Sequence, residues 1–570
     1  MSEQNQVRSE NAGKDGQKTN GTPRNASADE LLEAMANEAA EPKEQRSSLG
    51  RAMRDVVIVA ALLSGGTYVY YNHITTKEKT TKLAQEASDK LEKDDLKSLK
   101  EAQSIYEEIL KLDGDNAIGL SGLAETYFQE WRHGLDTKAK AEEYLNKAVK
   151  EGADTPERYA TAAYLDIAAG RAQKAETDIK TLLDKGAYHS KLAHAYGWAL
   201  MEQGKFIDAN RAVRGALDTD FNAVRYPFTL AEIAWRQGGP RNSGDKEALK
   251  NIMKVLSNGM NENHELALTE AAALRAKNYG NIDKPAKWIQ NVEARQADVG
   301  PVAVAQLDWA SGELALSLTD AKVALEKAEA AIGKRKDFPP FYDLKARALL
   351  AQGKTQDAYA AYEEGMKVGP GWRGLKWAYA ELRSAQNDDA ALAMIDELEK
   401  SDTTPQKGAE YEIFRGNHYL RMNKVDEAKA AFTRAAELGD DAEILFGLAR
   451  VTFLEEKKKA GKADLEKVAT DFETANTAKS TFPELQEYMA GVSLWNFQVD
   501  GAEGSFEEAE KQYKKLNRPV PELLAFYDRV VTAYEKAEGA AKAEAAKKVQ
   551  GWKDKKKEYL ASVAALLSGS

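Results

Sequence analysis

At 570 residues the chain exceeds the roughly 250 to 300 residues at which a single hydrophobic core stops growing, so several units or a repeat array are predicted. It carries 80 Lys and Arg against 91 Asp and Glu, a formal net charge of -11, which disfavours nucleic-acid binding because such proteins present a basic face. The absence of cysteine excludes disulfide bonds, thiolate metal sites and a cysteine nucleophile.

Residues 1–50 are predicted to form a disordered polar tail, because they are rich in Asn, Gln, Ser, Gly, Glu and Lys and poor in large apolar side chains. Within this tail a short helix is predicted over residues 28–40, where Ser27 and Glu30 have the spacing of a capping box. Two interpretations stay open: a transient helix without a role, and a docking segment that folds on a second partner.

Residues 54–74 read RDVVIVAALLSGGTYVYYNHI and contain an uncharged run from Val56 to Tyr71. As a helix this run spans about 24 Å, against a hydrocarbon core of about 30 Å, and flanking arginines and tyrosines could extend it into the interfaces. A buried core helix would need an apolar partner, which neither the polar tail nor the charged helices that follow would supply. The segment is therefore predicted to be a single transmembrane anchor.

The charges flanking this segment favour one orientation. Four basic residues precede the run, and three follow it. The positive-inside rule then places the N-terminus in the cytoplasm and the rest of the chain in the periplasm or another extracytoplasmic space, anchored to the cytoplasmic (inner) membrane. The four are Lys43, Arg46, Arg51 and Arg54, and the three are Lys77, Lys79 and Lys82.

From residue 80 to residue 535 the pattern is all-helical, with apolar residues at helical spacing and short Gly, Asp or Asn turns. A period also emerges, in which small residues early in each of two helices alternate with large ones. The clearest copies are Tyr342, Ala346, Leu349, Ala358, Tyr362, Gly365 and Pro370; Glu412, Gly416, Tyr419, Ala428, Phe432, Ala435 and Asp440; Ala193, Gly197, Leu200, Ala209, Val213 and Ala216; and Tyr159, Ala163, Asp166, Ala175, Ile179 and Leu182.

These four segments resemble the tetratricopeptide repeat (TPR) family, whose period is about 34 residues. The resemblance implies an all-α, right-handed superhelical solenoid of about ten to twelve helix pairs, in which each pair covers its neighbour's apolar face. Degenerate copies fill the remainder, and the match is poorest over residues 241–340. Residues 536–570 are predicted to form a C-terminal capping helix and tail.

Common catalytic and metal-binding motifs are absent. The sequence contains no phosphate-binding loop of the GxxxxGK[ST] type, no GxSxG elbow and no HExxH zinc helix. The closest histidines, His189 and His194, are five residues apart across a predicted turn, which does not favour joint metal ligation. No catalytic residue, metal or cofactor is expected.

The resemblance implies a concave surface lined by positions 2, 5, 6, 9, 12 and 13 of the first helix of each pair, which in the family binds an extended peptide or a partner helix. Tyr and Trp offer rigid contact area there, and Arg offers forked donors for carboxylates. Two units depart from the family's carboxylate clamp, which has Lys at position 5 and Asn at position 9. The predicted partner-binding residues are Tyr164, Lys191, His194, Trp198, Arg347, Asn417 and Arg421.

Trp372 and Arg373, in the segment GPGWRGLKW, complete the predicted partner-binding set. They fall at a junction between repeats. Two interpretations stay open: an exposed aromatic and cationic contact site, and a tryptophan that packs against the turn.

The sequence as a whole predicts a membrane-anchored scaffold that docks partner peptides or proteins, in assembly of an envelope complex, without binding nucleic acid. Two rivals stay open. One is a cytosol-facing receptor on an organelle surface, which a carboxylate clamp would favour. The other is a helical glycan-processing enzyme subunit, in which one of the many carboxylates would be catalytic.

Overall fold

The computed structural model describes residues 48–237, 246–261, 264–402, 408–439, 441–459, 464–479 and 481–568. Every regular element in these ranges is helical, which confirms the predicted all-α class. The chain divides into two compact units, Met1–Thr75 and Thr76–Ser570. Residues 1–47, and with them the short helix predicted over 28–40, lie outside the described residues.

The first helix, α2 (Ser48–Lys93), contains the segment predicted to be a transmembrane anchor, and this prediction is corrected. No helix in the described part of the chain is long and apolar enough to cross a membrane. The apolar run is short, and Ser64, the glycines and tyrosines after it and Asn72 dilute its hydropathy. The anchor over residues 54–74 is therefore not supported.

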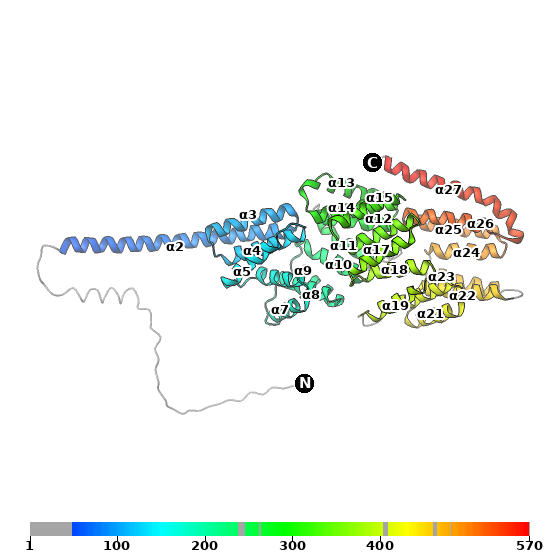
Figure 1. Cartoon of the computed structure of the whole chain (residues 1–570), viewed down its shortest axis with the longest axis horizontal. Helices are drawn as coiled ribbons and strands as arrows, with labels where there is room; N and C mark the ends of the chain where they lie inside the picture. The colour runs from blue at the N-terminus through cyan, green and yellow to red at the C-terminus, as the bar shows by residue number, and fades with distance from the viewer. Residues whose placement is uncertain are drawn as a thin grey trace, which may run out of the picture. The chain divides into compact units, whose positions relative to one another are not determined.

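The second unit is an array of helix pairs in which each helix from α3 on packs against its neighbours in sequence, and even-numbered helices such as α4, α6 and α8 also contact one another (Figure 1). The even-numbered helices are α4 (Ala117–Arg132), α6 (Pro156–Ala168), α8 (Ser190–Glu202), α10 (Arg225–Gln237), α12 (Glu265–Asn278), α14 (Pro301–Ser317), α16 (Pro339–Ala351), α18 (Arg373–Ala385), α20 (Glu410–Arg421), α22 (Ala442–Lys458), α24 (Pro483–Trp495) and α26 (Val520–Glu535).

The odd-numbered helices each follow an even-numbered helix in the chain, except the first of them, α3, which follows α2. They are α3 (Leu96–Leu112), α5 (Lys138–Lys150), α7 (Ala172–Asp184), α9 (Phe206–Thr219), α11 (Lys246–Asn261), α13 (Asp283–Glu293), α15 (Ala321–Lys334), α17 (Thr355–Val368), α19 (Ala390–Lys400), α21 (Val425–Leu438), α23 (Leu465–Ala478), α25 (Val499–Lys515) and α27 (Lys542–Ser568). Two short 3₁₀ helices, η1 (Gln296–Asp298) and η2 (Gly539–Ala541), join neighbouring helices.

Small residues let the two helices of a pair cross closely, as the repeat pattern predicts. A Cβ atom added to Gly416 of α20 would lie 2.7 Å from the ring of Phe432 in α21. The same ring fills the space beside Gly447 of α22, where an added Cβ would lie 2.3 Å away. One buried phenylalanine thus depends on glycines in two successive even-numbered helices, so it joins one pair to the next.

The array also makes contacts between helices that are far apart in the sequence. Helix α10 packs against α18. The backbone N–H of Gly280, after α12, donates to the carbonyl of Asn517, after α25, at 3.0 Å. Near the C-terminus α27 buries Trp552 against Phe526 and Tyr527 of α26. The segment predicted as a capping helix therefore has one apolar face in the core and a charged outer face.

We expect Gly447→Ala to destabilise the array by about 1 to 3 kcal/mol, because the new methyl group would collide with the ring of Phe432. The measurement is the urea midpoint of unfolding, followed by circular dichroism. Gly491→Ala in α24 is the matched control, since no atom lies within 4 Å of its Cβ position. The control should gain up to about 1 kcal/mol from helix propensity; equal effects of the two substitutions would contradict the packing argument.

Candidate binding surfaces on the even-numbered helices

The nine residues predicted to bind partners lie in four different environments. Tyr164, Lys191, His194 and Trp198 lie in a polar cluster between α4, α6, α8 and α10. Trp372 lines a cavity between α10 and α18, and Arg347 lies just behind its lining. Asn417 and Arg421 line a groove nearer the C-terminus, and Arg373 joins α18 to the end of α19 and to α20.

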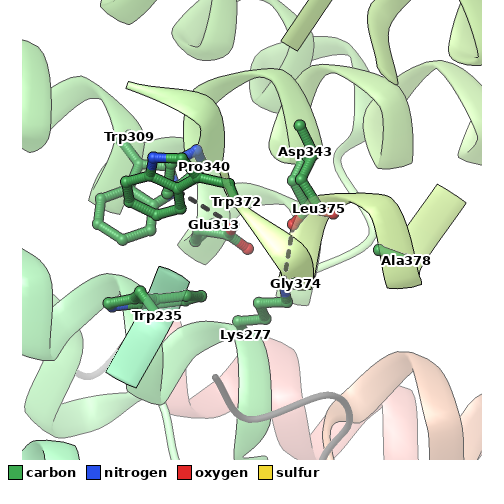
Figure 2. Close-up of a pocket in the computed structure, with 10 residues that line it drawn as sticks. All are labelled: Trp235, Lys277, Trp309, Glu313, Pro340, Asp343, Trp372, Gly374, Leu375 and Ala378. Atoms are coloured by element: carbon green, nitrogen blue, oxygen red, sulfur yellow. Dashed lines mark hydrogen bonds and ion pairs between the residues drawn. The ribbon is translucent and has the colours of Figure 1, made fainter. Parts of the chain in front are cut away.

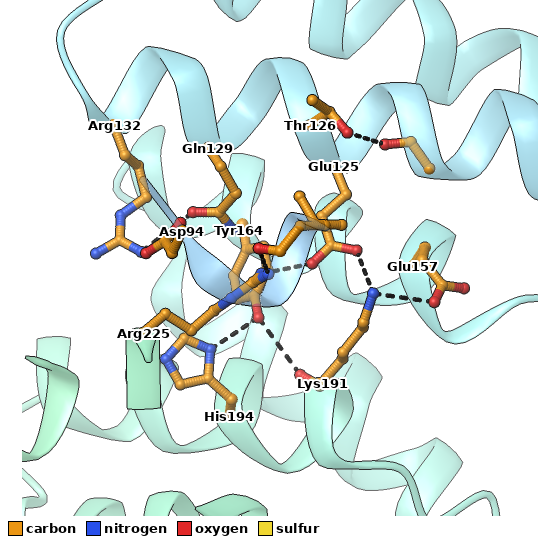
Figure 3. Close-up of polar contacts among 12 residues, drawn as sticks. Asp94, Glu125, Thr126, Gln129, Arg132, Glu157, Tyr164, Lys191, His194 and Arg225 are labelled. Atoms are coloured by element: carbon orange, nitrogen blue, oxygen red, sulfur yellow. Dashed lines mark hydrogen bonds and ion pairs between the residues drawn. The ribbon is translucent and has the colours of Figure 1, made fainter. Parts of the chain in front are cut away.

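An ionic cluster lies at the centre of the first environment (Figure 3). The Lys191 ammonium lies 2.8 Å from a carboxylate oxygen of Glu125 and 3.0 Å from one of Glu157. Arg225 donates to the other oxygen of Glu125 at 2.5 Å, and all three side chains of this Lys-Glu-Arg core are at most 3% exposed. Burial alone would lower the pKa of Lys191, but the two carboxylates raise it well above its usual value.

A chain of neutral hydrogen bonds lies beside the ionic cluster. The hydroxyl of Tyr164 lies 2.8 Å from Nδ1 of His194, whose Nε2 lies 2.8 Å from the hydroxyl of Thr229. Burial, followed by the positive charge of Arg225, lowers the pKa of His194 well below its usual value. The imidazole is therefore neutral at physiological pH. One of its ring nitrogens donates a hydrogen bond and the other accepts one.

The turn between α2 and α3 packs onto this cluster. Arg225 donates to the carbonyl of Leu91 at 3.0 Å, and the N–H of Val224 donates to the carbonyl of Glu92 at 3.1 Å. A ring nitrogen of His264 lies 3.1 Å from the carbonyl of Asp94. The chain's own residues thus occupy the inner face of these repeats, so Tyr164, Lys191 and His194 are buried where the sequence predicts exposed groove residues.

Trp198 lies at the edge of this cluster and is half-buried. Its Nε1 donates to Glu202 at 3.1 Å, and the Arg132 guanidinium lies 4.7 Å from its ring centroid. Arg373 also forms its hydrogen bonds within the chain, because it donates to the hydroxyls of Ser401 and Tyr411 at 2.9 and 2.6 Å. Both side chains hold neighbouring helices together.

The second environment is a cavity of about 40 Å³ between α10, α12, α14, α16 and α18 (Figure 2). Three tryptophans line it, Trp235, Trp309 and Trp372, and each is at most 8% exposed. The predicted contact residue Trp372 is therefore packed, with its ring centroid 5.5 Å from that of Phe338. Arg347 lies just behind the lining and donates to Glu313.

Glu270 supports this cavity from behind. Its carboxylate accepts a hydrogen bond of 3.1 Å from Nε1 of Trp235. Burial raises the pKa of Glu270 to about 8, and the hydrogen bond from the tryptophan only partly opposes this shift. The folded protein therefore keeps this carboxyl protonated at neutral pH.

The third environment is a groove of about 1330 Å³ across the even-numbered helices from α18 to α26. Aromatic rings form part of its lining, together with charges of both signs. The aromatic residues are Trp377, Phe414, Phe446, Phe482, Tyr488 and Tyr513. The basic residues are Arg421, Arg450, Lys479, Arg518 and Arg529, and the acidic residues are Glu381, Glu410, Asp441, Glu443, Glu484, Glu487 and Glu522.

Several of these charges pair across the groove wall, but two arginines do not. Arg529 forms an ion pair of 2.8 Å with Glu487. In contrast, Arg421 donates to the hydroxyl of Ser384 and Arg450 to the amide oxygen of Asn417. Among the described residues neither arginine has a carboxylate within ion-pair distance.

The environment of the two unpaired arginines favours an anion. Burial lowers the pKa of both, that of Arg450 to about 10, and the charge of Arg421 lowers the pKa of Arg450 further. The Nε of Arg450 is buried without a hydrogen-bond partner. A carboxylate placed between them would supply both the missing charge and the missing acceptor.

Arg450 was not among the residues predicted from the sequence, although a signal for it exists. It directly follows Ala449, the small residue of its repeat, just as Asn417 follows Gly416. Both therefore occupy the ninth position of their helix A, one of the concave positions. The repeat around Ala449 is degenerate, so its register is difficult to assign without the structure.

Comparisons with known proteins yield a distant structural likeness. No family model matches the chain, and no curated protein matches it. The chain is similar to a solved structure described as the APC/C hetero-tetramer Cut9-Hcn1, with 11% identity and a TM-score of 0.38, over 85% of this chain and 94% of that chain. Within the described residues no group of three or more His, Cys, Asp or Glu could hold a metal ion.

We expect Glu125→Gln to destabilise the N-terminal repeats by about 3 to 5 kcal/mol, because it leaves the charges of Lys191 and Arg225 buried without their shared partner. Hydrogen exchange of the α4 and α8 amides measures this loss locally. Asp184→Asn is the control, because its ion pair with Lys180 is exposed, and it should leave exchange unchanged. A change in Glu125→Gln no larger than in the control would contradict the role of the cluster.

The raised pKa of Glu270 predicts that the free energy of unfolding depends on pH. Between pH of about 5 and 8 its carboxyl is protonated in the folded state and ionised in the unfolded state, so unfolding releases a proton. The free energy of unfolding should therefore fall as pH rises through this window, by roughly 1.4 kcal/mol per pH unit from this group.

Glu270→Gln should remove this component of the slope, because the amide does not titrate. Urea unfolding at several pH values between about 5 and 8, followed by tryptophan fluorescence, compares the two proteins. Glu293→Gln, at an exposed position, should keep the wild-type slope. Parallel slopes for wild type and Glu270→Gln would show that the carboxyl does not titrate in this window.

Proposed function

We propose that this protein is a tetratricopeptide-like scaffold that binds an extended segment of a partner protein in the groove between α18 and α26. The observation that carries the proposal is the pair Arg421 and Arg450, which face the groove without a carboxylate partner. Arg450 is half-buried and has no carboxylate partner among the described residues, which costs free energy in the free protein, and a partner carboxylate would offset that cost.

The remaining lining suits a peptide. Aromatic rings such as Phe446, Phe482 and Tyr488 contact one another at centroid distances of 5.1 and 5.8 Å, and they offer a rigid apolar floor. Paired charges such as Arg529 and Glu487 can exchange partners at little cost. A segment that combines an acidic residue with apolar side chains therefore complements this groove.

The groove also stays open to a partner. The inner face of the N-terminal repeats is filled by the turn between α2 and α3. In the groove, by contrast, Arg421 and Ala525 are exposed. The predicted residues Asn417 and Arg421 lie there, so the proposal keeps this part of the predicted site.

A single-cysteine variant tests the proposal, because the natural chain has no cysteine. Peptides selected from a random library on the full chain should crosslink to a benzophenone attached at Ala525→Cys. Their affinity should fall by about tenfold or more in Arg421→Ala and Arg450→Ala, since each loses a charge-assisted contact.

Arg434→Ala is the matched control, because Arg434, on α21, pairs with Glu412 of α20 and does not line the groove. It should leave peptide affinity unchanged, and circular dichroism should show equal helix content in all variants. If the selected peptides bind both groove variants as tightly as the wild type, this groove is not the binding site.

The location of the protein and its role in assembly of an envelope complex stay predictions. Labelling intact cells with a membrane-impermeant maleimide, after Ser27→Cys or Ser243→Cys, tests the location. Reaction at position 243 alone is expected for an extracytoplasmic repeat region. Protection of position 243 until lysis would favour cytosolic partners instead.

A further inference from the structure

We propose that the cavity lined by Trp235, Trp309 and Trp372 binds an alkylammonium group that donates a hydrogen bond to Glu313. This cavity shares no lining residue with the groove described above, so the inference is independent of the proposed function. The ammonium could belong to a lysine side chain of a partner or to a free small amine, and the chemistry of recognition is the same.

The carboxylate of Glu313 supplies the polar half of the site. Glu313 is 1% exposed, and its Oε1 accepts hydrogen bonds from Arg347 and, at 3.3 Å, from Trp309. Its Oε2 is buried and has no hydrogen-bond partner. A buried carboxylate oxygen without a donor costs free energy, so a ligand that brings an N–H donor is favoured at this point.

The indole rings supply the other half. The rings of Trp235 and Trp309 have centroids 6.2 Å apart and meet at 62°, and Figure 2 shows Trp372 on the same side of the cavity. Indole faces attract cations within about 6 Å of the ring centroid. The site already shows this preference, because the Lys277 ammonium lies 6.0 Å from the Trp235 ring and the Arg236 guanidinium 5.6 Å from the Trp372 ring.

The neighbouring charges leave Glu313 available. Lys277 does not occupy the position beside Oε2, because its ammonium donates to Asp343 at 2.8 Å. Asp343 also accepts from Arg347 at 3.0 Å and from Tyr362 at 3.0 Å, so its own acceptors are satisfied. The free oxygen of Glu313 is thus the point at which a new donor would bind.

The size and position of the cavity restrict the ligand further. A volume of about 40 Å³ holds a few water-sized groups, which fits an ammonium with its nearest methylenes and not a folded segment. Lys277, Gly374 and Ala378 line the cavity and are only half-buried, so the cavity reaches the surface on their side. An alkyl chain can enter there with its ammonium end first.

The test uses the full chain labelled with 5-fluorotryptophan, with the ¹⁹F resonances assigned through Trp309→Phe and Trp372→Phe. The probes are n-butylammonium, n-butyltrimethylammonium and n-butanol. The ammonium should shift the resonances of Trp309 and Trp372 in a saturable manner. The trimethylated cation lacks an N–H, and the alcohol lacks the charge, so each should bind at least about tenfold more weakly.

Two variants keep the proposal falsifiable. Glu313→Gln should weaken n-butylammonium binding by about tenfold or more. Because this change also removes a partner of Arg347, Ala378→Val is the second variant, which fills the cavity without altering any charge. Equal shifts from all three probes, or unchanged n-butylammonium binding in both variants, would overturn the proposal and leave water as the occupant.

Two further probes distinguish the sources of the ammonium. N-acetyl-lysine methylamide represents a lysine within a chain, and free lysine represents a small amine. Binding of the capped form with an affinity equal to that of n-butylammonium would assign the site to a partner's side chain. Binding of free lysine at least about tenfold more tightly would assign it to a small-molecule amine.

Discussion

The structure depends on one constraint: a single helix pair cannot bury its apolar surface alone. Each pair in the second unit covers the next, and single side chains such as Phe432 fit against glycines of two successive even-numbered helices. Stability is therefore distributed along the array, as a sum of contacts between neighbours. Because no cysteine is present, this packing and the polar contacts between helices are the means of holding the array together.

The even-numbered helices also bury polar side chains, which apolar packing alone does not require. In the N-terminal repeats Glu125, Lys191 and Arg225 are buried together because the turn after α2 covers them. The desolvation of these charges is offset only while all three are present, so the cluster fixes the relative positions of α4, α8 and α10. We infer that the main effect of such a cluster is to select one arrangement of the repeats, and that its net contribution to stability is smaller.

Unsatisfied polar atoms recur along the even-numbered helices. Around Glu313 and around Arg450 a polar atom is buried without a partner, and in the N-terminal cluster Nε of Arg225 is likewise without one, although its charge is paired with Glu125. A buried polar group without a partner costs free energy, and a ligand that supplies the partner would offset that cost. The two proposals, a peptide groove and an ammonium cavity, use this same physical argument at independent positions.

The sequence by itself determined the all-α class and the pairing of helices, because the spacing of residues such as Gly416 and Phe432 reports contacts between neighbours in the chain. It also predicted Asn417 and Arg421 as contact residues, and both line the groove. It could not determine which inner faces are open. That depends on contacts such as Arg225 with Leu91, 134 residues apart, and the packing of α10 on α18, which no local pattern records.

The same limit explains the residues that the sequence misplaced or missed. Tyr164 and His194 have the residue types of a binding surface, but tertiary packing buries them. Glu313 lies in the region where the repeat pattern is poorest and Trp235 lies just before it, and only the close approach of α10, α14 and α18 makes them one site. A repeat period reports the packing of helices that are neighbours in the sequence. Which polar groups find partners depends instead on how helices that are distant in the sequence come together.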